Sequence, residues 1–126
     1  MLTRLLGLDY GRQYIGIAIS NSDHTIAFPR AVWKGKSKEQ ISGELNQLIR
    51  EEGVVEIVVG WPLSMTGKPT PQTTETAEFI EWLKEKTFLP VAKIDERWSS
   101  IQAKKLGGDH SVAAQILLQT YLEMKK

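Results

Sequence analysis

The amino-acid sequence predicts an α/β fold in which a mixed five-stranded sheet, three antiparallel strands followed by two parallel ones, carries helices on both faces. Two short apolar runs at 5–10 and 15–20 flank Gly11-Arg12-Gln13, a spacing typical of a β-hairpin. The almost continuous aliphatic run at 54–59 is typical of a strand that is covered on both faces. Apolar residues recur at helical spacing between the later strands, and such crossover connections make those strands parallel.

Local signals predict the other elements. A third strand is expected over 25–33, where Pro29 restricts it to a sheet edge or a bulge. Ser37 is expected to cap a helix that ends near Glu52, because apolar residues recur there at helical spacing. The elements expected after the aliphatic run are a turn at 60–62, a loop over 63–74, a helix that buries Thr76, Phe79, Ile80 and Leu83, a strand at 90–94, a short helix at 101–106 and a last helix at 110–124.

Length and composition predict one soluble domain over residues 1–126. Hydrophobic residues make up 41% and charged residues 25% of the 126-residue chain, as in ordinary globular proteins. The net charge of +1 produces no global attraction to polyanions, so a nucleic-acid site would have to be a local cluster of basic residues. The absence of cysteine excludes disulfides and thiolate zinc sites, and no apolar run reaches membrane-spanning length. We therefore expect a cytoplasmic protein with no membrane partner.

Two carboxylates are expected at the carboxyl ends of strands, where the ligands of such sheets gather. Asp9 lies near the end of the first strand and Glu96 follows the strand at 90–94, and we expect them to share one ion because their strands are neighbours. Oxygen ligands of this kind suit Mg²⁺ or Mn²⁺, which can activate water and stabilise charge on a phosphodiester. The alternatives are that Asp9 caps the turn and that 95–97 is a solvated strand end where Arg97 pairs with one acid.

Basic and aromatic side chains near these acids are candidates for contacts with nucleic acid. Basic residues there would form a rim for phosphates, although charged side chains are as often simply solvated. The residues expected at this rim are Arg12, Lys68, Arg97, Lys104 and Lys105. Trp61 and Trp98 could stack on unpaired bases, with core packing as the alternative for at least one of them. The loop over 63–74 is expected to border the acids and to be mobile without substrate, because it has few apolar anchors.

Four ordered motifs, together spanning essentially the whole chain, carry a family resemblance. The motifs are Leu6–Gly11 with Ile15–Ser20, Ile57–Leu63 with Gly67, Asp95–Ser100 with Ala103, and Ala113–Gln119 with Tyr121 and Leu122. Together they resemble the YqgF family, also called RuvX, of small RNase H-like proteins that are named as Holliday junction resolvases and as pre-16S rRNA nucleases. The resemblance implies an RNase H-like sheet and a metal-dependent endonuclease that hydrolyses phosphodiesters of structured nucleic acid. The implied role is processing of the 5′ end of pre-16S rRNA; the alternatives are a Holliday junction resolvase and a catalytically weak nucleic-acid-binding assembly factor.

The resemblance also assigns the site residues. The family's first-strand Asp falls on Asp9, and the Glu of its Asp-Glu-Arg motif falls on Glu96. The position of its third acid is His110 in this chain, with Asp109 one residue earlier, and Asn21 stands where the family usually has an Asp. We therefore expect Asp9, Glu96 and His110 to be the catalytic and metal-binding residues, Mg²⁺ or Mn²⁺ to be the cofactor, and the protein to be a monomer or a weak homodimer. Because imidazole replaces one carboxylate, Mn²⁺ is expected to be preferred over Mg²⁺.

A different class of enzyme is also considered, in which 7–11 would be the phosphate-binding hairpin of an actin-like or sugar kinase. Those folds enclose a nucleotide between two lobes, and 126 residues are too few for the second lobe. The sequence therefore favours the nuclease over the kinase.

Overall fold

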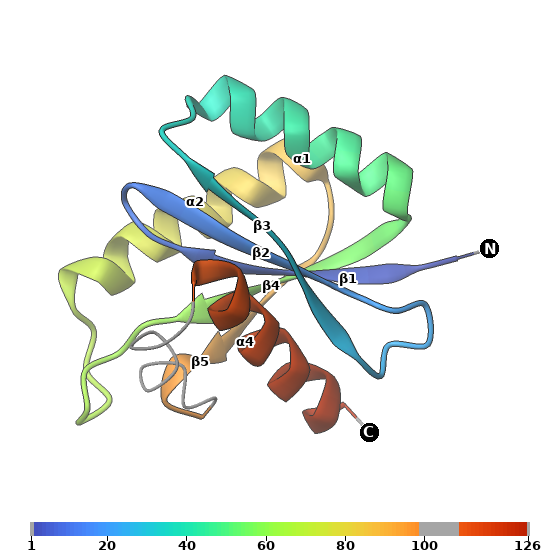
Figure 1. The fold of residues 1–126 in the computed structure, drawn as a ribbon. Coiled ribbons are helices and arrows are strands. Elements are labelled where there is room, and N and C mark those ends of the chain that lie inside the picture. Colours follow the sequence, from blue (N-terminus) through green and yellow to red (C-terminus); the bar gives the residue numbers. More distant parts are fainter. Residues whose placement is uncertain (1, 99–108, 126) are drawn as a thin grey trace.

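A computed structural model describes residues 2–98 and 109–125 and contains one five-stranded mixed sheet (Figure 1). Its strands are β1 (Arg4–Tyr10), β2 (Tyr14–Ser20), β3 (Ala27–Lys34), β4 (Val54–Trp61) and β5 (Val91–Asp95). They lie in the order β3-β2-β1-β4-β5, where β1 pairs antiparallel with β2 and parallel with β4. The predicted combination of three antiparallel and two parallel strands is confirmed.

Helices cover both faces of the sheet, as predicted. Figure 1 shows α1 (Lys38–Glu52) and α2 (Pro71–Thr87) on one face and α4 (His110–Met124) on the other. A single turn of 3₁₀ helix, η1 (Glu96–Trp98), follows β5. The apolar side chains form two clusters, one under α1 and α2 and one under α4, because alternate residues of each strand point to opposite faces.

Small residues let α4 lie directly on the sheet. A Cβ added to Gly7 would come within 2.8 Å of Leu118 Cβ, and one added to Gly16 within 2.0 Å of the carbonyl oxygen of His110. Both glycines belong to the face under α4, together with Ala18. Any larger side chain at these positions would hold the helix, and with it His110, away from the strands.

The edge strand β3 and the cap of α1 agree with the sequence signals. Pro29 lies beside a register shift in the pairing of β2 with β3, where Ile17 faces Ala31 and Ala18 faces Pro29. Ser37 caps α1, and its hydroxyl accepts a hydrogen bond from the backbone N–H of Gln40. Both predictions from local chemistry are confirmed.

The predicted loop over 63–74 is wrong at its end, because the helix begins before residue 74. The predicted turn at 60–62 is wrong in part, because its first two residues belong to a strand. Strand β4 continues through Trp61, and α2 already begins at Pro71, with Thr70 as its N-cap. Proline is well suited to the first helical position because the missing N–H would have no partner within the helix there. The shorter loop that remains folds back on itself through a bridge between Leu63 and Pro69.

The last two predictions concern the short helix expected before α4 and membrane-spanning segments. The short helix expected at 101–106 lies outside the described residues, as do Lys104 and Lys105. Among the helices of the described residues, none is long and apolar enough to span a membrane.

Candidate active site

Asp9 is a carboxylate enclosed at the end of β1. Strand alternation puts it on the same face as Leu5 and Gly7, under α4, and its side chain is 0% exposed. A carboxylate is costly to bury without compensating charge or hydrogen bonds. Its position is therefore that of a functional or a strongly compensated acid.

The first residue of α4 brings an imidazole to this carboxylate. Asp109 caps the helix by accepting hydrogen bonds from the backbone N–H groups of Ser111 and Val112. His110 then lies over Gly16, the residue that pairs with Asp9 across the two strands. The Nδ1 atom of His110 is 3.8 Å from Oδ2 of Asp9. Nδ1 is buried and makes no hydrogen bond within the described part of the chain.

Glu96 reaches the same end of the sheet from η1. Its Oε1 atom would lie 2.8 Å from a Cβ at Gly60, so the absence of a side chain there makes room for the Glu96 carboxylate beside β4. The expectation that Asp9 and Glu96 follow neighbouring strands is wrong, because β4 lies between β1 and β5. The two carboxylates therefore lie at the same end of the sheet with the width of one strand, β4, between their own strands.

The carboxylate and imidazole groups at this site are suitable ligands for a divalent cation, but within the described residues they do not form a group of three around one point. Two ligand atoms about 2.1 Å from one ion lie at most about 4.2 Å apart, so the 3.8 Å between His110 and Asp9 is compatible with a shared ion. Carboxylate oxygen with imidazole nitrogen is a donor set that Mn²⁺ accepts. Among residues 2–98 and 109–125, no three His, Asp or Glu side chains are grouped closely enough to hold one ion.

An aromatic residue absent from the sequence predictions fixes the imidazole. The ring of Tyr14 stacks on His110 with centroids 3.3 Å apart and planes 14° apart. A Cβ at Gly11 would lie 2.6 Å from Cζ of the Tyr14 ring, so Gly11 leaves space for this ring. Strand alternation from Gly16 back to Tyr14 was the signal that could have found it, since both share the face of Asp9.

A pocket of about 450 Å³ opens next to the acids. It is lined by Tyr14 and Glu96 together with Pro62 and Gln72 from the segment that joins β4 to α2. Residues 10–13 of the β1–β2 hairpin complete the lining. A substrate group in this pocket would contact Glu96 directly.

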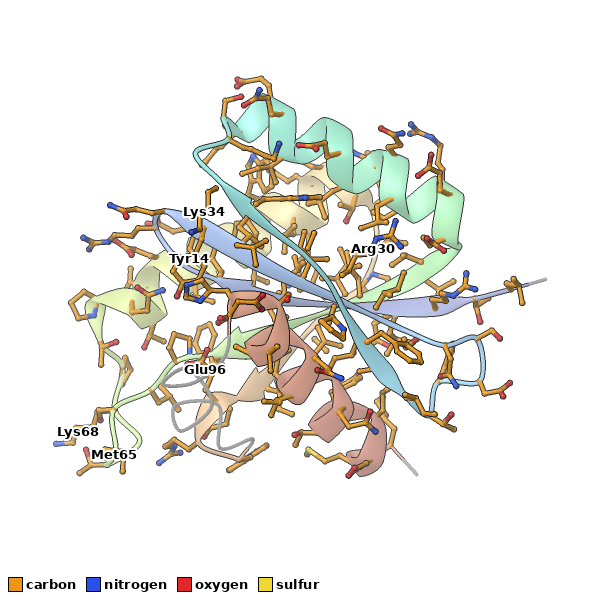
Figure 2. All side chains as sticks on the ribbon, viewed as in Figure 1. Tyr14, Arg30, Lys34, Met65, Lys68 and Glu96 are labelled. Carbon is orange, nitrogen blue, oxygen red and sulfur yellow. The ribbon has the colours of Figure 1, made fainter. Side chains whose placement is uncertain are left out.

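Two of the predicted rim residues make ion pairs within the chain. The guanidinium of Arg97 donates to both carboxylate oxygens of Asp95, at 2.7 Å for the closest pair, and these hydrogen bonds hold the pKa of Asp95 below its usual value. This confirms the alternative in which Arg97 pairs with one acid of 95–97. Arg12 pairs with Glu75 of α2 at 2.7 Å and is not directed to Asp9 by that contact. Lys68 is exposed in the loop between β4 and α2 (Figure 2).

Three other residues singled out from the sequence lie in different surroundings. Trp61 packs on the apolar cluster under α1 and α2, where Lys93 Nζ is 4.0 Å from its ring centroid, so core packing is confirmed for this tryptophan. Trp98 is 61% exposed and follows Glu96 closely. Asn21 accepts hydrogen bonds from the backbone of Thr25 and Ile26 and so stabilises the β2–β3 turn, at the end of β2 opposite to Gly16. Its replacement of an Asp therefore does not change the charge beside Asp9.

Comparison with known proteins agrees with this architecture. The family model described as "RuvX: Holliday junction resolvase" matches residues 3–124. A relative from Dictyoglomus turgidum named "Putative pre-16S rRNA nuclease" is 36% identical over 95% of this chain and 94% of its own. A relative of the same name from Maridesulfovibrio salexigens is 34% identical over 94% and 97%.

A solved structure shows the same fold at lower sequence identity. The structure titled "T. thermophilus RuvC in complex with Holliday junction substrate" superimposes with a TM-score of 0.62 at 14% identity, over 98% of this chain and 95% of its own. The likeness to RuvC confirms the RNase H-like sheet predicted from the sequence. With a family model that spans nearly the whole chain and relatives above 30% identity, this chain belongs to the RuvX family.

Proposed function

We propose that this chain is a metal-dependent nuclease that hydrolyses phosphodiester bonds in structured nucleic acid. The observation that carries the proposal is the enclosed carboxylate of Asp9 with the Nδ1 atom of His110 3.8 Å away, beside a pocket that Glu96 lines. Acids and an imidazole brought to one end of a sheet are the ligands that hydrolytic metal sites use. We propose further that residues 1–126 act as a single cytoplasmic domain, as a monomer or a weak homodimer.

Asp9, His110 and Glu96 would hold Mg²⁺ or Mn²⁺. When bound, the ion would stabilise the charge that develops on the phosphoryl oxygens and lower the pKa of a bound water. Tyr14 restrains the imidazole of His110 by stacking on it, so that Nδ1 stays directed to Asp9. The low exposure of Asp9 keeps bulk water from competing at this ligand.

Basic side chains would position the nucleic-acid strand through its phosphates without recognising its base sequence. Lys68 is exposed on the loop that borders the pocket, and Arg97 packs against Gly67 of the same loop. Arg97 and Arg12 could contact phosphates only with the part of their guanidinium groups that their ion pairs leave exposed. Lys104 and Lys105 complete the proposed set, in the part of the chain outside the described residues.

The substrate we propose is the 5′ region of pre-16S rRNA, the RNA in the names of the relatives. A branched DNA junction is the second candidate, because the family model carries a Holliday junction description. The test is cleavage of both substrates with Mg²⁺, with Mn²⁺ and with a chelator, comparing the wild type with Asp9→Asn. Metal-dependent cleavage of the RNA alone supports the first substrate, and cleavage of the junction alone supports the second. If the folded wild type binds either substrate and cleaves neither with any metal, the protein is a binding or assembly factor and the nuclease proposal is wrong.

A further inference from the structure

A second pocket lies on the opposite side of the β1–β2 hairpin from Glu96. Its volume is about 850 Å³, within the range of about 300–1,000 Å³ in which proteins hold small ligands. The hairpin tip, 11–13, contributes to both pockets and so forms a common wall. His110 and Tyr14 line this second pocket as well, which makes it continuous with the surroundings of Asp9.

Aromatic rings supply most of the apolar lining. Tyr10 stacks on Phe79 with centroids 4.0 Å apart and planes 15° apart, and Phe79 lies 5.8 Å from Trp82 at 19°. Trp33 at the end of β3 adds a fourth ring to the lining. Phe79 is buried, whereas the other three rings are half-buried. Nearly parallel, partly accessible rings are the surface on which a planar nucleobase stacks.

The polar lining is cationic. Among the described residues that line this pocket, none is acidic, and the four basic ones are Arg12, Lys34, Lys36 and Lys38. Two of these are paired, Arg12 with Glu75 and Lys36 with Glu44. Lys34 and Lys38 make no ion pair within residues 2–98 and 109–125 and are exposed, and Lys38 Nζ lies 5.8 Å from the ring centroid of Trp82. Figure 2 shows Lys34 and Tyr14 toward the same end of the sheet. A cluster of four cations is notable in a chain whose net charge is only +1.

We propose that this second pocket binds an unpaired nucleotide of the substrate strand, next to the phosphodiester at Asp9. The base stacks on the rings of Tyr10, Trp33 and Trp82, and the flanking phosphates pair with Lys34 and Lys38. Stacking is indifferent to base identity, and the lysines recognise only phosphate, so the pocket selects single-stranded character and not sequence. The inference rests on the proposed nuclease function, which it sharpens: the enzyme would cut beside a single-stranded segment.

Asp9 and Tyr10 are consecutive residues that point to opposite faces of β1. A nucleic-acid strand that passes the β1–β2 hairpin would therefore have one phosphodiester on the Asp9 side of β1 and a neighbouring nucleotide on the Tyr10 side. A blunt duplex cannot place a base between these rings without breaking a base pair. The pocket thus predicts a difference in affinity between substrates with and without an overhang.

The test measures binding with divalent metal removed, so that it does not depend on cleavage. A blunt-ended RNA duplex labelled at one internal base is compared, by fluorescence anisotropy, with the same duplex bearing a four-nucleotide unpaired end on either side. The overhang should tighten binding to the wild type by about 5- to 150-fold, the effect of stacking one base.

Two variants should remove this preference. Trp82→Leu removes one of the half-buried rings. The double variant Lys34→Gln with Lys38→Gln removes the two exposed lysines that make no ion pair within the described residues. The double variant should also reduce the slope of log affinity against log salt by about 1.4 for two phosphate contacts on a single strand. The matched controls are Phe88→Leu, an exposed ring outside the pocket, and Lys125→Gln, an exposed lysine at the C-terminal end of α4 that does not line the pocket. If Trp82→Leu fails to fold, the lysine variant, which changes only exposed side chains, decides the question.

The outcomes separate this inference from the nuclease proposal. Cleavage without any overhang preference overturns the nucleotide pocket and leaves the nuclease. An overhang preference without cleavage supports the pocket and overturns the nuclease. An unchanged preference in both pocket variants overturns the assignment to this pocket, as does a change in oligomeric state in Trp82→Leu without a change in RNA affinity.

Discussion

The two faces of the sheet are built on different packing principles. Under α4 the strands present Gly7, Gly16 and Ala18, and the helix backbone lies within atomic contact of the strands. Under α1 and α2 they present large residues such as Leu6 and Leu8. Close packing on the first face fixes one imidazole against one carboxylate. At the end of the second face, aromatic side chains line a pocket of about 850 Å³.

Each face also carries one buried carboxylate, and the two differ in what surrounds them. Asp95, which alternation in β5 puts on the face of Val91, accepts hydrogen bonds from the Arg97 guanidinium and backbone. Asp9 has the imidazole of His110 at 3.8 Å, too far for a hydrogen bond. The guanidinium makes Asp95 a structural acid, whereas the imidazole beside Asp9 is suited to share a cation with it.

The largest effect is expected for Asp9→Asn. The loss of a charged ligand should lower metal-dependent cleavage by about 1,000-fold or more, since a bound metal contributes several kcal/mol to the transition state. Initial rates with Mn²⁺ measure this, and circular dichroism checks the fold. Asp23→Asn, the same change at an exposed site in the β2–β3 turn, should retain the wild-type rate. Cleavage by Asp9→Asn at that rate would remove Asp9 from the mechanism.

The second prediction concerns the charge on α4. His110→Asp restores a carboxylate beside Asp9 and should raise the affinity for Mg²⁺ by about 10–100-fold, the usual size of a change in ligand support. Mn²⁺ should gain less, because it already tolerates imidazole. Titration calorimetry with both ions measures the two affinities. The control is His24→Asn, at the other histidine, which bonds Thr3. Equal affinities in wild type and His110→Asp would put His110 outside the metal site.

The third prediction compares two glycines. Gly16→Ala places a Cβ against the carbonyl of His110 and should lower the free energy of unfolding by about 1–3 kcal/mol. Gly43→Ala in α1 meets nothing within 4 Å and should raise the free energy of unfolding by about 0.5–1 kcal/mol through better helix propensity. Urea unfolding of both variants gives the two values. A stabilised Gly16→Ala would mean that α4 is not packed on this face as closely as described.

The smallest effect is expected for Asp95→Asn. Weakening the pair with Arg97, whose side chain is 34% exposed, should cost about 1 kcal/mol of unfolding free energy. The affinity for Mn²⁺ should remain that of the wild type, because Asp95 is engaged by Arg97 and is not a ligand. Urea unfolding and calorimetry of the same preparation test both statements. A loss of Mn²⁺ affinity with unchanged stability would reverse the roles assigned to the two carboxylates.

The sequence alone determined the elements and the position of Asp9 within them. Alternation in β1 and β2, the turn at Gly11, the Ser37 cap and the aliphatic run of β4 are short-range signals, and each element formed close to where its signal lies. The sequence left the roles of 95–97 open, because an acid next to an arginine occurs both in metal sites and in simple ion pairs.

Only the tertiary structure decided which strand ends lie next to each other and which side chains meet there. Strand β4 separates β1 from β5 because two crossovers place it in the middle of the parallel half, and no local pattern encodes that order. The stack of Tyr14 on His110 joins residues 96 positions apart, and Tyr10, Trp33 and Trp82 line one pocket from three different elements. Such contacts depend on how closely helices pack on the sheet, which the glycines allow but do not by themselves reveal.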